Sequence, residues 1–455
     1  MRKIGNFVNK YFYFLLVPMM IVGFLANYQA NTMGGILPYY RNFAQLIRSG
    51  FQIDLEFPTF PIWGYGFIYA ITDNKILIFL LQFCISLFTI YMLDKLMQQT
   101  FSTNAAKTLL RFFLLFSFPW FSFNANLWPY SIAANFIILA LIFLYTSFKN
   151  NKIWYAVISA CLLGIALNFR SDYYLFPLSL AFILIIYRIY LWQKKLPTNI
   201  KMHIISLWLI LTYVFLLPYA IYTKENTGHY LITSTNSGHV LFIGLGLFPD
   251  NKWGIIPFDW DPEMQRVLDA EFGQGKAPSS LQYEGDKFLR EYFFNLVKED
   301  PVEYMKKVVY SIYLMLRGGF YSGVYQNWAS PAEGTNEDIN ESLTKRDIKQ
   351  ILQIFQREGT LFTVLCSLQI LIKAYSMLFF LFFNLSLLFF LYKRFYQSNY
   401  LLSGMFIIIV LYQYAVCLLG YYMSGYITNL YLIYLSLIFW TIDCYLKSKN
   451  YREQS

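Results

Sequence analysis

The stretch LWPYSIAANFIILALIFLYTSF, from Leu127 to Phe148, decides the class of fold, because none of its 22 residues is charged. An α-helix rises about 1.5 Å per residue, so a helix of this length spans the hydrocarbon layer of a bilayer, which is about 30 Å thick. Nine further runs of similar character flank it. They are Tyr11–Tyr28, Ile76–Leu93, Thr108–Phe123, Ile153–Leu167, Tyr173–Trp192, His203–Tyr222, Leu371–Tyr392, Leu401–Met423 and Ile427–Leu446. The sequence therefore predicts an all-α polytopic membrane protein with about ten transmembrane helices.

The composition of the whole chain agrees with this prediction. Hydrophobic residues make up 57% of the 455 residues and charged residues only 14%, whereas a soluble domain carries about 25% charged residues. These values exclude a disordered chain, a collagen-like chain and an ordinary soluble domain. The net charge of +10 does not indicate a nucleic-acid partner, because Lys and Arg in a membrane protein gather in the cytoplasmic loops.

The distribution of Lys and Arg predicts the orientation of the chain. With the N-terminus in the cytoplasm, the cytoplasmic segments hold 17 Lys and Arg and only two acids, Asp94 and Glu453. These segments are 1–10, 94–111, 149–152, 188–201, 393–400 and 447–455. We expect a multi-pass protein of the plasma (inner) membrane with cytoplasmic N- and C-termini, in which the first apolar run is a retained signal anchor.

This topology divides the chain into three parts. Residues 1–222 form an N-terminal transmembrane module that includes a first outside loop at 29–60. Residues 223–358 form an extracytoplasmic region of amphipathic helices, and residues 359–455 carry the C-terminal transmembrane helices.

Capping residues predict three helices in the outside region. Asp261 and Asp300 each precede a proline, which is the pattern of an N-cap followed by Pro at the first helical position. A third helix is expected to begin after Asp347 and to end at Gly359. The basic residues that flank the apolar part of the second helix, 304–320, favour a helix on the membrane surface over one that crosses the membrane.

Neither the cysteines nor the histidines indicate a metal or cofactor site, and we expect none. The five cysteines are widely spaced in apolar runs, without a C-x-x-C pair, and the three histidines are isolated. Asp259-Trp260-Asp261 has the D-x-D pattern of a metal–nucleotide motif, but the capping role of Asp261 explains it better. His239 lies in a polar, glycine-containing stretch that suits a ligand loop or, more simply, a turn.

Two acids of the first outside loop, Asp54 and Glu56, are candidates for a general base. A carboxylate in a membrane-facing cleft can take a proton from an acceptor hydroxyl if burial raises its pKa toward the working pH. A pair of solvated loop acids explains them equally well. The two residues share a side of an extended segment but diverge on a helix, so we expect only one of them to act.

Arg170 and Arg41 are candidates for binding a phosphate. Arg170 lies in a short outside turn between two runs, where its planar guanidinium suits two phosphate oxygens. The alternative is an interfacial anchor paired with Asp172. Arg41 shares a helix face with Arg48, and that face would either meet lipid phosphates or anchor the helix at the membrane surface.

Taken together, these features resemble the GT-C superfamily of membrane glycosyltransferases, and most closely the bacterial relatives of the protein O-mannosyltransferases (glycosyltransferase family 39). The likeness covers most of the chain through loose motifs. They are an amphipathic stretch with Tyr40, Ala44 and Gly50, a Pro-rich aromatic segment at 58–65, an Arg after the short fifth run at Arg170, and a Pro-led helix at 300–304.

Such enzymes move a sugar from a polyprenyl-phosphate carrier outside the membrane. The resemblance therefore implies an inverting sugar transferase with a polyprenyl-phosphate sugar donor and a glycan, lipid or protein acceptor. It assigns the base to Asp54 or Glu56, the donor phosphate to Arg170 and Arg41, and substrate contacts to Tyr40, Trp63, Tyr65, Asp172 and His239.

The family's usual acid stands shortly before the tyrosine, where Asn31–Pro38 has no carboxylate. Either Asp54 or Glu56 has taken that role, or the chain departs from the family pattern, or it lacks the activity. Two other functions fit the same arrangement of runs. One is a polysaccharide polymerase or ligase of the O-antigen type, and the other is a flippase or transporter, which the lack of an internal repeat disfavours.

Overall fold

The computed structural model of the protein describes residues 2–28, 37–320, 328–345, 347–394 and 400–454. Every regular element in these residues is a helix, as the apolar runs predict. Residues 29–36 of the predicted first outside loop, with most of its acid-free stretch, lie outside the described residues, as do 321–327 of the predicted outside region and 395–399 of a predicted cytoplasmic segment.

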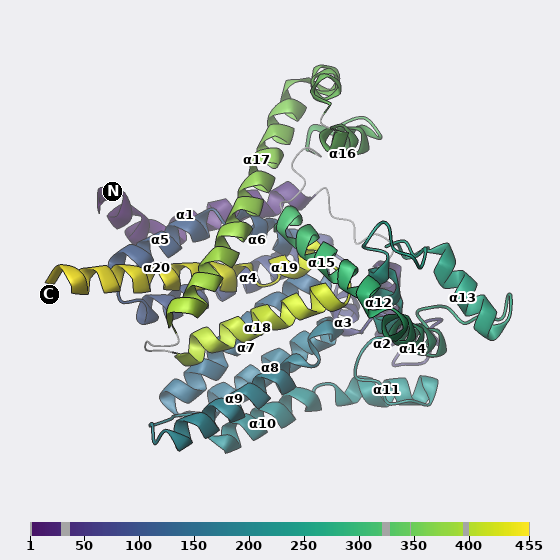
Figure 1. Ribbon diagram of the computed structural model, residues 1–455, viewed down its shortest axis with the longest axis horizontal. Helices are drawn as coiled ribbons and strands as arrows, with labels where there is room; N and C mark the ends of the chain where they lie inside the picture. Colours follow the sequence, from purple (N-terminus) through teal and green to yellow (C-terminus); the bar gives the residue numbers. More distant parts are fainter. Residues whose placement is uncertain (1, 29–36, 321–327, 346, 395–399, 455) are drawn as a thin grey trace.

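Long apolar helices pack side by side and form a bundle, and both ends of the chain lie at the same end of it (Figure 1). Helix α7, which includes all but the first two residues of the stretch Leu127–Phe148, is its centre, because most of its side chains are buried. The bundle contains α1 (Arg2–Tyr28), α4 (Lys75–Thr100), α5 (Asn104–Leu115), α6 (Phe118–Ala125), α7 (Pro129–Asn150), α8 (Ile153–Phe169), α9 (Phe176–Gln193), α10 (Met202–Val214), α17 (Ile348–Arg394), α18 (Tyr400–Leu419) and α20 (Tyr431–Gln454).

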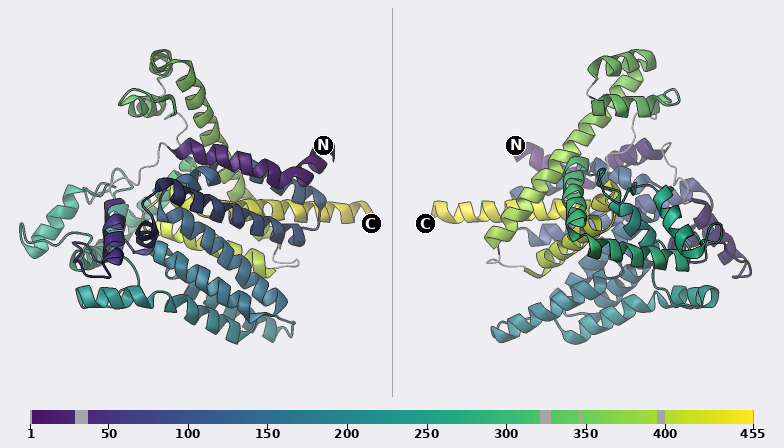
Figure 2. Two further views of the ribbon diagram at one scale, coloured as in Figure 1. Left: turned by 180° about the vertical axis from the view of Figure 1, so that it is seen from behind. Right: turned by 45° about the vertical axis from the view of Figure 1, so that its right-hand side comes forward.

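Shorter helices gather at the opposite end of the bundle, which we call the loop end (Figure 1). They are α2 (Leu37–Arg48), α3 (Gly64–Ile71), α11 (Leu217–Thr227), α12 (Ser237–Leu245), α13 (Pro262–Phe272) and α14 (Tyr283–Glu299). From there α15 (Pro301–Gly318) runs back over the bundle, and the short α19 (Ser424–Thr428) precedes α20. Figure 2 shows α16 (Thr335–Lys345) and the first turns of α17 projecting away from the bundle.

Seven helical stretches in the described residues are long and apolar enough to cross a membrane. They are Gly5–Leu25, Lys75–Thr100, Pro129–Asn150, Ser171–Gln193, Met202–Thr227, Ile348–Phe389 and Leu401–Leu419, and α8 is a shorter apolar helix. The predicted run 108–123 is divided between α5 and α6, because the helix ends at Leu115 and Pro119 lies in the first turn of a new one. The protein is therefore helical and membrane-embedded, while ten spans remain a prediction.

The capping residues act as predicted from the sequence. An Oδ1 of Asp261 accepts a hydrogen bond from the Glu263 amide at 3.1 Å at the start of α13, and Asp300 accepts one from the Glu303 amide at 2.9 Å at the start of α15. The helical geometry of α17 is interrupted at Gly359, where φ is +86°, as expected for the end of the third outside helix. These local signals are sufficient because a cap involves only residues within one turn of each other.

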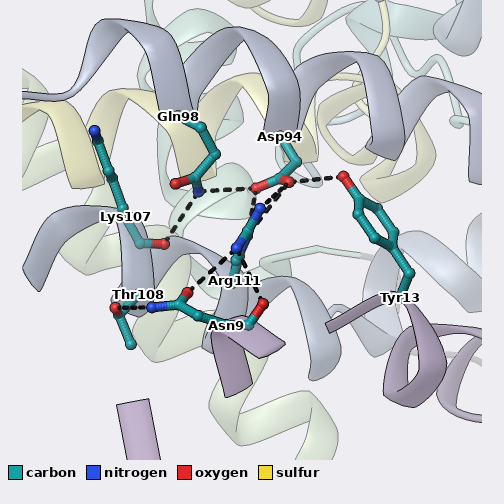
Figure 3. Close-up of polar contacts among 7 residues, drawn as sticks. All are labelled: Asn9, Tyr13, Asp94, Gln98, Lys107, Thr108 and Arg111. Carbon is teal, nitrogen blue, oxygen red and sulfur yellow. Dashed lines mark hydrogen bonds and ion pairs between the residues drawn. The ribbon is translucent and has the colours of Figure 1, made fainter. Parts of the chain in front are cut away.

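An ion pair near the end that holds both chain termini joins three helices of the bundle (Figure 3). Asp94 of α4 is buried and accepts from the guanidinium of Arg111 of α5 at 2.9 Å, from the Tyr13 hydroxyl of α1 at 2.8 Å and from the Gln98 amide at 2.9 Å. The remaining Nη1 of Arg111 donates to the backbone and side-chain oxygens of Asn9 at 3.4 Å. We call these five residues the closed cluster, since every nitrogen of the arginine has a partner in it.

Candidate functional site

Arg170 is held in a fixed orientation at the loop end by its own turn of chain. Helix α8 ends at Phe169, and Arg170 adopts an extended conformation before the short 3-10 turn Ser171–Tyr173. This turn brings Asp172 back toward Arg170, and its two oxygens accept from Nε at 2.8 Å and Nη2 at 2.7 Å. The pair is mostly buried, with 13% and 19% of the two side chains exposed.

Aromatic side chains from three distant parts of the sequence surround this guanidinium. Its carbon lies 3.5 Å from the ring centroid of Tyr130, at the start of α7, and 5.2 Å from that of Tyr426 in α19. The two rings are stacked with centroids 5.6 Å apart. The buried Tyr40 of α2 completes the group: burial raises the pKa of its phenol, and the positive charge of Arg170 opposes that rise. We call Arg170, Asp172, Tyr130, Tyr426 and Tyr40 the arginine box.

One nitrogen of Arg170 is left over in the arginine box. Asp172 occupies Nε and Nη2, and within the described residues Nη1 makes no hydrogen bond. The backbone carbonyl of Asp172 accepts from the Tyr412 hydroxyl of α18 at 2.6 Å, which fixes the carboxylate side of the pair. The box can therefore present two N–H donors in a fixed direction to an anion, because guanidinium donors lie in one rigid plane.

Trp63 and Tyr65 are both buried, and both have polar partners within the protein. The Trp63 indole N–H donates to Asn168, two residues before Arg170, at 2.8 Å, and its ring stacks on Tyr222 of α11. The Tyr65 hydroxyl donates to the Gln82 side chain at 2.8 Å, and its ring packs edge-on against Tyr40. The two residues therefore support the backbone and the walls of the arginine box.

Asp54 and Glu56 lie in an irregular segment at the loop end, between α2 and α3, and both are exposed, so neither has the burial that we expected of a general base. Neither forms an ion pair or a hydrogen bond through its side chain within the described residues, and neither contacts Arg170. The same segment is anchored three residues later, where the Thr59 carbonyl accepts from the Tyr219 hydroxyl at 2.9 Å. The carboxylates thus lie at the same end of the bundle as Arg170 but outside the arginine box.

The two arginines of α2 have different surroundings, although both are exposed. Arg48 pairs with Asp73 at 3.0 Å. It also donates to the carbonyls of Tyr69 and Ala70, the two residues before the last residue of α3. Arg48 therefore caps the C-terminus of α3, where cations are favoured. Its position on the face of α2 does not by itself predict this structural role. Arg41 lies close enough to Tyr69 that its charge opposes the burial-driven rise in the pKa of that phenol.

His239 lies in the first turn of α12 and is buried. Its Nδ1 lies 2.9 Å from Oγ of Ser280, and its Nε2 lies 3.0 Å from an oxygen of Asp259. The D-x-D motif is thus divided between two tasks, since Asp261 caps α13 and Asp259 binds His239.

Sequence reasoning found Arg170, Asp172, Tyr40 and His239, but it missed Tyr130, Tyr426 and Ser280. The chain contains 39 tyrosines, so no compositional signal separates the two that face Arg170 from the rest. Their hydroxyls lie 3.5 Å apart although 296 positions separate them in the sequence, so only the packing of α7 against α19 reveals them.

No protein-family model, no curated protein and no solved structure matches the chain. The resemblance to a glycosyltransferase superfamily therefore depends on the sequence motifs alone.

Proposed function

We propose that the protein is an integral membrane glycosyltransferase that transfers a sugar from a polyprenyl-phosphate donor to an acceptor at the loop end of the bundle, on the extracytoplasmic face. The observation that carries the proposal is the arginine box: a mostly buried guanidinium, oriented by Asp172 and stacked on Tyr130, with Nη1 free of protein partners in the described residues. An anion at the boundary between bundle and loops suits these donors.

In the proposed reaction, the bond between the sugar C1 and the phosphate oxygen breaks as the acceptor oxygen attacks C1. Negative charge grows on the departing polyprenyl phosphate, and Nη1 of Arg170 donates to it. Asp172 and Tyr130 keep the guanidinium plane fixed, so no reorganisation is needed as the charge develops. The acceptor proton passes to a carboxylate, for which Asp54 and Glu56 are the candidates.

In the proposal these two acids act on the acceptor side of the site. Both are exposed on the irregular segment beside α2, apart from Arg170. A base that lies away from the leaving group fits inversion, because the acceptor attacks C1 from the face opposite the phosphate. No metal takes part in the proposal, and the positive charge comes from Arg170, with Arg41 near Tyr69 as a second cation at the loop end.

The test is ligand binding followed by transfer, with full-length protein in lipid nanodiscs. Polyprenyl phosphate and the matching polyprenol are titrated against the intrinsic tryptophan fluorescence of wild type, Arg170→Ala and, as a control, Arg48→Ala. We expect wild type and Arg48→Ala to prefer the phosphate at least 10-fold and Arg170→Ala to lose this preference. Equal binding of both lipids by wild type would refute the proposal.

Transfer itself is measured in membranes of a deletion strain that carries Asp54→Asn or Glu56→Gln. We expect one of the two variants to lose transfer of sugar from the lipid-linked pool. If both keep full activity, the base assignment is wrong. A change in the chain length of surface polysaccharide in that case would instead favour a polymerase or ligase.

A further inference from the structure

A second group of reactive side chains lies in the loop end, outside the arginine box. Ser280, His239 and Asp259 come from three separate segments and form a hydrogen-bonded chain: Ser280 Oγ to His239 Nδ1 at 2.9 Å, and His239 Nε2 to Asp259 at 3.0 Å. A hydroxyl, a base and an acid that orients the base are the three parts of an activated nucleophile.

Close packing of two helices fixes His239 and Ser280, while the side chain of Asp259 is 87% exposed. Gly238, the neighbour of His239, approaches α14 so closely that a Cβ at this position would lie 1.9 Å from the Asp286 carbonyl. Gly285, in the first turn of α14, would in the same way bring a Cβ within 2.3 Å of the Ser279 carbonyl and 3.3 Å of the Ser280 Cα. Because neither glycine has a Cβ, the backbone segments that carry His239 and Ser280 can lie this close together.

The carboxylate decides which nitrogen of His239 carries the proton. An Asp259 oxygen beside Nε2 accepts its N–H, which leaves the lone pair of Nδ1 facing the Ser280 hydroxyl. The hydrogen bond from His239 lowers the pKa of Asp259, so the carboxylate is ionised at neutral pH. His239 is buried while Ser280 is half-buried, so the base is shielded from water more than the residue that carries the hydroxyl.

We propose that Ser280 is the nucleophile of a second catalytic site, which cleaves carboxylic esters with His239 as the general base and Asp259 as the positioning residue. Ser280 Oγ bonds to the ester carbonyl carbon while its proton moves to His239 Nδ1. The bond between the carbonyl carbon and the alcohol oxygen then breaks, and His239 Nδ1 gives its proton to that oxygen. The products of this step are an acyl-serine and a free alcohol. Water then attacks the acyl group, again giving a proton to Nδ1, and releases the carboxylic acid as the proton returns to Ser280.

The surroundings of Ser280 fit the transition state of this reaction. Helix α14 begins three residues later, and its N-cap residue Gln282 makes no side-chain hydrogen bond to the amides of the first turn. The N-terminal end of α14 therefore follows Ser280 closely along the chain, and we propose that its amides stabilise the oxyanion.

The ester we expect has an apolar acyl chain and is presented at the membrane surface. Phe258 and Trp260, on either side of Asp259, are stacked with ring centroids 5.0 Å apart and are 50% and 71% exposed. Exposed aromatic rings of this kind are typical of the membrane–water interface, where acyl chains meet polar groups. The proposal does not depend on the sugar-transfer function, because it shares no catalytic residue with the arginine box.

The test uses purified full-length protein in detergent and a fluorophosphonate, which bonds through phosphorus to an activated serine with loss of fluoride. We expect peptide mass spectrometry to find the label on Ser280 of wild type. Ser280→Ala should not be labelled there, and His239→Gln, which keeps the serine, should react about 100-fold more slowly. Ser279→Ala is the matched control and should react like wild type.

Hydrolysis of p-nitrophenyl butyrate gives the second readout. We expect Asp259→Asn to lose most of the rate and Asp259→Glu to recover part of it, because the longer acid still accepts from Nε2. A purely structural tether would leave wild type unlabelled at Ser280 and without hydrolysis above the Ser280→Ala background, and that result would overturn the proposal.

Discussion

The arginine box and the closed cluster contain the same ion pair, an Arg and an Asp buried in an apolar bundle, but they join different things. In the closed cluster, Arg111 and Asp94 connect α1, α4 and α5, and every guanidinium nitrogen has a partner (Figure 3). In the arginine box, Arg170 and Asp172 are two residues apart in one turn. A pair that bridges helices contributes to the packing of the fold, whereas a pair within one turn fixes the direction of a side chain.

The two arginines also differ in how many of their N–H donors have a partner, and the difference follows from what surrounds each of them. Helices that converge on Arg111 supply oxygens on every side of it, because their backbones are close. Rings surround Arg170, and rings accept no in-plane hydrogen bond. The guanidinium of Arg170 is therefore oriented by Asp172, while its Nη1 makes no hydrogen bond within the described residues.

The largest expected effect is on stability, in the closed cluster. Arg111→Ala leaves the Asp94 carboxylate, whose side chain is 1% exposed, without its cation. We expect the loss of about 3–5 kcal/mol of stability, seen as a large fall in the apparent melting temperature of the protein in detergent. The double variant Asp94→Asn with Arg111→Met should recover much of the lost stability. If Arg111→Ala has the same melting temperature as wild type, the closed cluster does not stabilise the packing of the three helices.

In the arginine box we expect a substitution to change ligand affinity more than stability. Arg170→Lys keeps the charge but loses the planar fork, so we expect about a 10-fold weaker affinity for polyprenyl phosphate. The melting temperature should fall by less than for Arg111→Ala, since Asp172 is 19% exposed and its carboxylate bonds only to Arg170 of the same turn in the described residues. Unchanged affinity together with a large fall in melting temperature would make the box a structural feature like the closed cluster.

Lys307 of α15 is another buried ionisable residue, and it has no acidic partner in the described residues. Its ammonium donates to the carbonyl of Leu418 at 2.9 Å and to that of Gly420, at the end of α18, and burial lowers its pKa to about 7. The unfolded chain, in which the pKa of lysine is about 10.4, binds more protons between these two values, so stability rises with pH across this window. We expect the melting temperature of wild type to rise from pH 7 to about pH 9 relative to that of Lys307→Met.

The smallest effect is expected from an exposed pair. Arg48 and Asp73 have side chains that are 43% and 54% exposed, and water screens their attraction. We expect Arg48→Ala to cost about 0.5–1 kcal/mol, mostly through the lost cap of α3. A melting temperature of Arg48→Ala as low as that of Arg111→Ala would contradict the assumption that burial explains the contrast between the two regions.

Part of the candidate site follows from the sequence. Arg170 stands two residues before Asp172 between two apolar runs, and this spacing predicted that the two residues could pair. The structure contains that pair. The role of Arg111 was not predictable, because the positive-inside argument counts it and Asp94 only as a cytoplasmic base and a cytoplasmic acid. In the fold the two residues form one ion pair between α4 and α5, which a count of charges along the sequence does not show.

Local sequence is sufficient to predict the class of fold, the membrane-embedded helices and the caps of α13 and α15. Each of these depends on composition or spacing within about 20 residues, over which a helix is continuous. The packing of distant helices determines that every guanidinium nitrogen of Arg111 is paired, that Nη1 of Arg170 has no hydrogen bond within the described residues, and that Ser280 meets His239. Those outcomes depend on the directions in which helices far apart in the sequence pack, and no local pattern records these directions.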